Sequence, residues 1–176
     1  MRNIQAAFTL TSATSSPENL NVILDGEAFS KKVISSLAQG DKQLRFVREG
    51  ETVEKWEKMV AFKRQTFGSD PKAVANRMAQ MALLFNGQAQ ANVSVDEGAL
   101  EAYVNYKAWP EGNRYTEFNL YRFAKSADGK AVVALHFARR FPRVNIDTDE
   151  LNRIRESWLK QAYSFDMKSV FDALGE

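Results

Sequence analysis

Residues 114–141 read RYTEFNLYRFAKSADGKAVVALHFARRF, and this stretch decides the fold. Apolar side chains recur at every second position along residues 114–125 and again along residues 130–141, which is the pattern of two β-strands. Asp128 and Gly129 stand between the two runs. An Asp-Gly pair flanked by alternating apolar residues is the strongest short signal for an antiparallel hairpin. The stretch therefore predicts two long antiparallel strands.

The pairing of the hairpin follows if Asp128 and Gly129 are its two turn residues. Tyr121 then lies opposite His136 on one face of the hairpin, and Glu117 lies opposite Arg140 on the same face. Both faces carry large apolar side chains, whereas a sheet with one solvated face would alternate more cleanly. We therefore expect both faces of this hairpin to be covered by other elements.

Two helices are expected after the hairpin. Asp147 and Glu150 form a pair typical of a helix start, with the acidic groups at the positive end of the helix. The apolar positions that follow fall on one helical face; they are Leu151, Ile154, Trp158, Leu159 and Ala162. A second, short amphipathic helix is predicted from Met167, Val170, Phe171 and Leu174.

The segment before the hairpin predicts one helix and two strands. Asp70 is a good N-cap, and Pro71 is tolerated in a first helical turn. The helix is expected over residues 71–86, with a buried stripe of Val74, Met78, Met81, Ala82 and Phe85. Residues 93–95 form a weak strand pattern, and residues 100–109 form a strong one.

The first third of the chain mixes strand and helix signals. Residues 20–24 predict a strand that is closed by Asp25 and Gly26. Residues 27–39 are predicted as a helix, because Phe29, Val33, Ile34 and Leu37 have helical spacing. Residues 44–47 are predicted as a strand. Residues 49–66 are read as one helical turn followed by a strand from about residue 56.

Composition describes an ordinary globular chain of 176 residues, of which 44% are hydrophobic and 26% are charged. We expect a loose arm over residues 1–18 and a single α+β domain over residues 19–176. The expected fold is a mainly antiparallel sheet with helices packed on both faces, an α/β/α sandwich. The formal charge of +2 is too balanced to predict a nucleic-acid binder.

No stretch of the sequence is long and apolar enough for a transmembrane helix, and the first ten residues do not form a signal peptide. Two locations stay open. If a leader has been removed, an extracytoplasmic location is favoured; otherwise the location is cytoplasmic. The oligomeric state stays open as well.

Two segments, EGETVEKWEKMV at residues 49–60 and EFNLYR at residues 117–122, together with this order of elements, resemble the PsbP-like superfamily. The likeness covers about residues 20–165. It implies an α/β/α sandwich around an antiparallel sheet, and many bacterial members are small exported proteins of unknown role. It also implies binding and assembly roles, and it carries no catalytic residues over to this chain.

The sequence offers little catalytic chemistry. It has no Cys and one His, so cysteine-based catalysis and Cys-rich zinc sites are excluded, and any triad must use His136. No glycine-rich phosphate loop and no metal-ligating motif are present. We assign no catalytic residue, no cofactor and no metal ligand.

The expectation for function is therefore a non-catalytic binding or assembly module with another protein as its partner, acting outside the cytoplasm. The candidate surface combines the densest basic stretch with aromatic side chains; its residues are Trp109, Tyr121, His136, Arg139, Arg140 and Arg143. A first alternative is a small-molecule or lipid carrier with an apolar cavity between helix 71–86 and the sheet. A second alternative is a hydrolase that uses His136.

Overall fold

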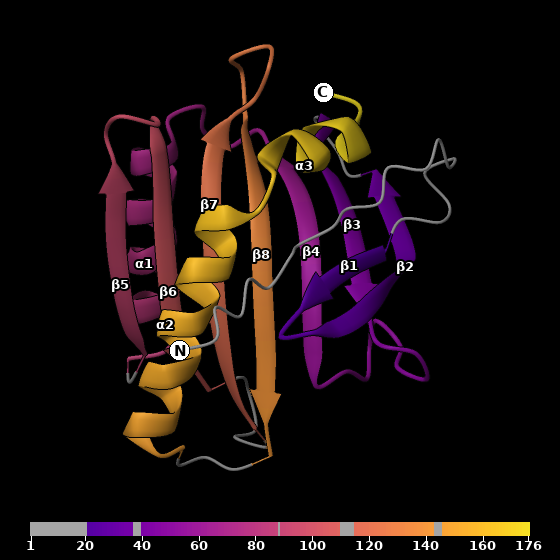
Figure 1. Ribbon diagram of the computed structural model, residues 1–176. Coiled ribbons are helices and arrows are strands. Elements are labelled where there is room, and N and C mark those ends of the chain that lie inside the picture. Colours follow the sequence, from indigo (N-terminus) through magenta and orange to yellow (C-terminus); the bar gives the residue numbers. More distant parts are fainter. Residues whose placement is uncertain (1–20, 37–39, 88, 110–114, 143–145) are drawn as a thin grey trace, which may run out of the picture.

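The computed structural model describes residues 21–36, 40–87, 89–109, 115–142 and 146–176. They form a mixed α+β fold with a large antiparallel sheet and three helices (Figure 1). The strands are β1 (Asn21–Leu24), β2 (Glu27–Ser36), β3 (Lys42–Val47), β4 (Lys58–Gln65), β5 (Gln90–Asp96), β6 (Glu101–Ala108), β7 (Thr116–Lys125) and β8 (Val132–Phe141). The helices are α1 (Pro71–Phe85), α2 (Thr148–Ser164) and α3 (Met167–Leu174). The expected arm over residues 1–18 lies outside the described residues.

The sheet is built from two meanders that meet in its middle. The strand order is β1-β2-β3-β4-β8-β7-β6-β5, and all neighbouring pairs are antiparallel. The first four strands follow one another along the chain, as do the last four. The chain crosses between the two meanders through α1, and β4 then pairs with β8. Residues that are far apart in the sequence therefore face one another across the β4–β8 junction.

The predicted β7–β8 register is confirmed. Tyr121 pairs with His136, and Glu117 pairs with Arg140. The prediction of a two-residue turn is wrong, because the Ser126 N–H donates to the Ala131 carbonyl at 2.9 Å and leaves residues 127–130 as a four-residue loop. The Asp128 carboxylate accepts hydrogen bonds from the Ser126 hydroxyl and the Lys130 N–H, which holds this wider loop in place.

The predicted helix over residues 27–39 is wrong: residues 27–36 form strand β2. Asp25 and Gly26 have positive φ values of 54° and 76°, as a two-residue hairpin turn requires. Strand β2 therefore folds back on β1. The pairing register of β2 with β3 shifts between Lys31 and Val33. A bulge of this kind interrupts the period of two, so the apolar residues took on a spacing close to that of a helix. Leu37 lies outside the described residues.

The expected helical turn near residue 50 is also wrong, since residues 49–57 contain turns and bends but no helix. The Glu51 carboxylate accepts hydrogen bonds from the N–H groups of Arg48 and Glu57 at 3.2 and 2.9 Å. The Glu51 side chain thus takes the place of backbone carbonyls as the acceptor for these N–H groups, and the segment needs no helical hydrogen bonds to satisfy them. The strand that follows is confirmed and begins at Lys58.

Helix α1 is confirmed at nearly its predicted bounds, but its predicted buried stripe is wrong. Asp70 caps the helix by accepting from the N–H groups of Lys72 and Ala73, both at 3.2 Å. Val74 is buried as expected. Met81 and Phe85, however, are 39% and 79% exposed. The stripe has helical spacing along its whole length, yet only its first half is buried.

Of the three apolar clusters among the described residues, two combine side chains of the sheet with side chains of a helix. The larger contains Phe118, Leu120 and Trp158 of α2, and the smaller contains Tyr121 and Val74 of α1. Because neighbouring residues of a strand point to opposite faces, β7 supplies both clusters from alternate positions. We call the two sides the Leu120 face and the Tyr121 face. In Figure 1, α2 passes in front of the sheet and α1 lies behind β5 and β6.

None of the helices in the described ranges is long and apolar enough to cross a membrane.

Candidate functional site

Two of the six residues predicted as a surface, Tyr121 and His136, are buried, so the prediction is wrong for these two. Tyr121 and His136 are only 5% and 4% exposed, and their rings stack in parallel with centroids 3.8 Å apart. Arg139 and Arg140 are half-buried at the end of β8, and Trp109 is half-buried just after β6. Arg143 lies outside the described residues. The buried Tyr121–His136 pair therefore cannot be part of a protein docking surface.

The two described arginines are engaged within the molecule. The Arg140 guanidinium lies 3.8 Å from the ring centre of Trp56 and 4.7 Å from that of Tyr115, and it pairs with Glu117 at 3.2 Å. Arg139 lies 3.7 Å from the Glu57 carboxylate. Each of these two arginines is thus paired with a carboxylate of the same molecule, so the two side chains offer little free charge to a partner.

Trp109 lies beside the end of α1. Its carbonyl oxygen accepts a hydrogen bond of 2.7 Å from the Asn86 side chain, which follows the last residue of the helix. The last five residues of α1 include four exposed apolar side chains, which we call the α1 patch: Met81, Leu83, Leu84 and Phe85. One predicted site residue therefore lies beside an exposed apolar surface, and two residues of that surface, Met81 and Phe85, had been assigned to the core from the sequence pattern.

A second group of chemically active side chains occupies the Tyr121 face at the β4–β8 junction. The Lys63 ammonium lies 3.3 Å from the Tyr121 hydroxyl, to which it donates a hydrogen bond, and 5.1 Å from the Tyr121 ring centre. Arg45 of β3 lies in register with Ala61, and Ala61 lies in register with His136. We call Arg45, Lys63, Tyr121 and His136 the Lys63 cluster.

His136 is held as a neutral ring with one nitrogen bonded and one free. Nε2 lies 2.8 Å from Oδ1 of Asn119, an oxygen that only accepts, so the proton is assigned to Nε2. Nδ1 is buried and makes no hydrogen bond with any residue that the structure describes. Burial lowers the pKa of His136 well below its usual value, and the positive charges of Lys63 and Arg45 lower it further.

Burial also lowers the pKa of Lys63 to about 8, and the charge of Arg45 acts in the same direction. Glu117 opposes this effect, but its carboxylate is already paired with Arg140. Neither Arg45 nor Lys63 takes part in any of the ion pairs formed among the described residues. Two cations thus lie close together without a carboxylate partner in the described part of the chain.

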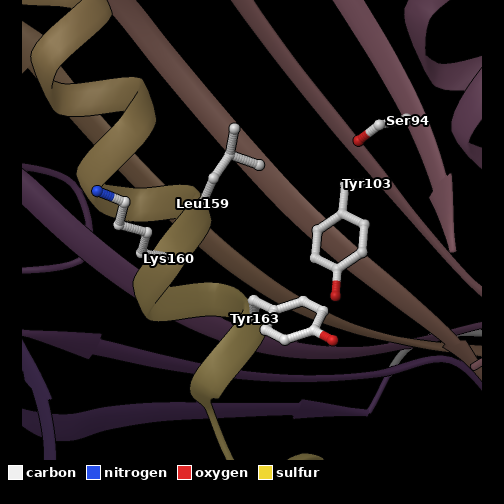
Figure 2. Close-up of a pocket in the computed structure, with 5 residues that line it drawn as sticks. All are labelled: Ser94, Tyr103, Leu159, Lys160 and Tyr163. Carbon is white, nitrogen blue, oxygen red and sulfur yellow. The ribbon is translucent and has the colours of Figure 1, made fainter.

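A groove opens on the opposite, Leu120 face between α2 and the strands β5 and β6 (Figure 2). Its volume is about 380 Å³, and it is lined by Ser94, Tyr103, Leu159, Lys160 and Tyr163. The Tyr103 hydroxyl donates to the Glu101 carboxylate at 3.0 Å, and burial raises the pKa of Tyr103. The groove therefore has a mostly apolar wall and offers no paired acid and base.

The geometry gives no carboxylate to His136, because its hydrogen-bond partner is the amide of Asn119. No group of three or more metal-ligating side chains is found in the parts of the chain that the structure describes. The sequence pattern did not indicate Arg45, Lys63 or Asn119 as site residues. Lys63 itself could have been noticed, because it is a charged residue on the same side of β4 as Met59 and Ala61, which are both buried.

Comparison with known proteins gives one match. Neither the curated proteins nor the solved structures contain a significant match to this chain. A protein-family model matches residues 17–167, which is most of the chain and includes all eight strands. The chain therefore belongs to the family that this model describes.

Proposed function

We propose that this protein is a non-catalytic binding module that docks a partner protein through the α1 patch. The observation that carries the proposal is the exposure of large apolar side chains at the end of α1, where Leu84 is 76% exposed and Phe85 is 79% exposed. Contiguous exposed apolar side chains often mark interaction surfaces. Trp109 borders the patch, and tryptophan is a frequent anchor of protein interfaces.

Charge around the patch indicates the chemistry of the partner. Helix α1 contains no acidic residue, and Arg77 lies four residues before Met81. The Lys107 ammonium lies 5.0 Å from the ring centre of Trp109, at the border of the patch. A partner segment with an apolar face and acidic residues at its rim would complement this surface. We commit to a partner of this kind, as opposed to a second copy of the chain.

We interpret the layers as an α/β/α sandwich, in which α1 covers part of the Tyr121 face while α2 and α3 cover part of the Leu120 face. The membership of the two core clusters supports this interpretation. The same layering is expected from the resemblance to the PsbP-like superfamily, which we keep as a proposed relationship. Binding and assembly roles are what that resemblance implies.

A carrier of small molecules is the second candidate. The apolar cavity expected under α1 needs Met81 and Phe85 as lining residues, and both side chains are instead exposed. What favours a small ligand is the Lys63 cluster, whose charges are not balanced by described neighbours. That cluster is separate from the α1 patch, so the two binding roles can be tested independently.

The test uses two substitutions in the patch, Leu84→Glu and Phe85→Glu, in one variant. Leu100→Glu is the matched control, because Leu100 is 71% exposed but does not belong to the patch. A partner captured by cross-linking is purified, and its affinity for the three proteins is measured. We expect at least a tenfold loss for the double variant and no change for the control. The acidic rim predicts that binding weakens as salt is raised.

Two results would overturn the proposal. One is an unchanged affinity of the double variant for every captured partner. The other is a wild-type protein that dimerises in sedimentation experiments while the double variant stays monomeric, because the patch would then be covered by a second copy.

A further inference from the structure

The Lys63 cluster is an unusual arrangement for the inside of a sheet. Arg45 and Lys63 are half-buried, and His136 is only 4% exposed. All three side chains lie on one face of three adjacent strands. Burying a cation is costly unless it is paired. The described residues offer Lys63 only the Tyr121 hydroxyl, and they offer Arg45 only the Gln43 side chain at 3.4 Å.

Hydrogen bonding leaves the same place incomplete. Nδ1 of His136 and Nε of Arg45 are buried and make no hydrogen bond with the described residues. Buried polar atoms are nearly always paired in folded proteins, so two such atoms in one cluster require an explanation. Arg45, Ala61 and His136 lie in one row across the sheet, and the small side chain of Ala61 separates the two larger ones.

We infer that the Lys63 cluster binds a small hydroxycarboxylate. Its carboxylate would pair with the guanidinium of Arg45 and the ammonium of Lys63. Its hydroxyl would donate a hydrogen bond to Nδ1 of His136. This site goes beyond the proposed protein-docking role, uses none of the residues of the α1 patch, and can stand or fail without it.

The choice of this ligand class follows from what each side chain needs. Two cations call for an anion, and the planar Arg45 fork matches a carboxylate. Nδ1 of His136 is an acceptor, because the proton of the ring is assigned to Nε2, so the ligand must also bring a donor. A molecule that carries a carboxylate and a nearby hydroxyl meets both needs.

Phosphate fits the site less well. Phosphate groups are commonly held by backbone N–H groups of loops and helix N-termini. The cluster lies within paired strands, where the backbone N–H groups serve the sheet ladder, and its donors are side chains. Inorganic phosphate is therefore a discriminating probe in the test.

The single histidine makes the experiment direct. The chain contains only one His, so the ring ¹⁵N signals in an NMR spectrum belong to His136 without assignment. We would titrate the protein with lactate and malate, with propionate and succinate as analogues without the hydroxyl, with lactamide as an analogue without the charge, and with inorganic phosphate. We expect lactate or malate to shift the His136 signal with a Kd of about 1 mM or lower, so that the shift is close to saturation at about 10 mM ligand.

Lys63→Met and Arg45→Met test the charge requirement. Each is expected to weaken binding about tenfold or more, as the loss of a charged hydrogen-bond partner does. Lys72→Met is the matched control, because Lys72 is an exposed lysine paired with Glu97 on the surface. Thermal unfolding checks the fold, and Lys63→Met should unfold no earlier than the wild type because it removes a half-buried charge.

The outcomes separate the possibilities. The inference is overturned if neither lactate nor malate shifts the His136 signal, or if Lys63→Met and Arg45→Met bind as tightly as Lys72→Met. Equal binding of propionate or succinate would remove the hydroxyl from the ligand class. Tighter binding of inorganic phosphate than of lactate and malate would overturn the carboxylate assignment.

Discussion

Arg122 connects two layers of the molecule through one side chain. Its guanidinium donates to both carboxylate oxygens of Glu101, at 2.8 and 2.7 Å. It also donates to the carbonyl oxygens of Ala162, Tyr163 and Phe165, at 2.7, 3.1 and 2.9 Å. The last carbonyls of a helix have no helical partner. Arg122 therefore satisfies the end of α2 and attaches it to β7.

We predict that Arg122→Met destabilises the protein by about 3–5 kcal/mol, the cost of removing one partner of a buried ion pair. Glu101 is 9% exposed and would lose its counter-charge. Urea unfolding followed by circular dichroism measures the change. Lys168→Met is the control, since the Lys168–Asp172 pair is exposed to solvent and should contribute little to stability. Equal effects of the two substitutions would contradict the role assigned to Arg122.

Single-residue predictions from the sequence succeeded where the partners lie close along the chain. The Asp-Gly signal gave the β7–β8 register, and with it the Glu117–Arg140 ion pair and the Tyr121–His136 contact. Lys63 could not be placed in the same way. Its neighbours depend on the pairing of β4 with β8, strands separated by most of the second meander, and no local pattern encodes that pairing.

At the scale of elements, the errors have two physical causes. In β2, a shift of register between Lys31 and Val33 breaks the alternation on which a strand prediction relies. In α1, the periodicity correctly predicted a helix but not how far the sheet extends beneath it. An apolar stripe shows which side of a helix is apolar, and a binding surface at the end of the helix gives the same pattern as core.

Substitutions in α1 can separate these two meanings of apolar. We predict that Val74→Ala, at a residue 2% exposed, lowers the free energy of unfolding by roughly 2 kcal/mol, because two methyl groups leave the core. Leu84→Ser, at a residue 76% exposed, should change it by less than about 0.5 kcal/mol. Chemical denaturation of both variants measures this. A large loss for Leu84→Ser would mean that the end of α1 is part of the core after all.

At the scale of the whole molecule, the β4–β8 junction joins two four-stranded meanders into one sheet. The Lys63 cluster lies at this junction, with Arg45 and Lys63 from the first meander and Tyr121 and His136 from the second. Both meanders must therefore fold and pair before the cluster exists. The cluster makes the stability of the whole fold depend on pH, because the pKa of His136 is lower in the folded protein than in the unfolded chain.

The direction of that dependence follows from the pKa of His136. Burial, together with the charges of Lys63 and Arg45, holds this pKa well below 6.5 in the folded protein. Below pH 6.5 the unfolded chain binds a proton that the folded protein does not, so the free energy of unfolding falls as pH falls, with a limiting slope of about 1.4 kcal/mol per pH unit. The carboxylates of Asp25, Glu27 and Glu51 have lowered pKa values, and their stabilising contribution is lost only as pH falls below their usual pKa values towards the lowered ones.

We therefore predict a loss of stability between pH 6.5 and pH 5 that His136→Gln removes. Glutamine has no titratable group and can still donate an N–H to Asn119, so the variant keeps the partner and loses only the titration. Urea unfolding at intervals of half a pH unit gives both curves. The comparison rests on their slopes, so a uniformly less stable variant is still informative. Parallel curves over this window would show that His136 is protonated in the folded protein, and the acceptor role of its Nδ1 would then be lost.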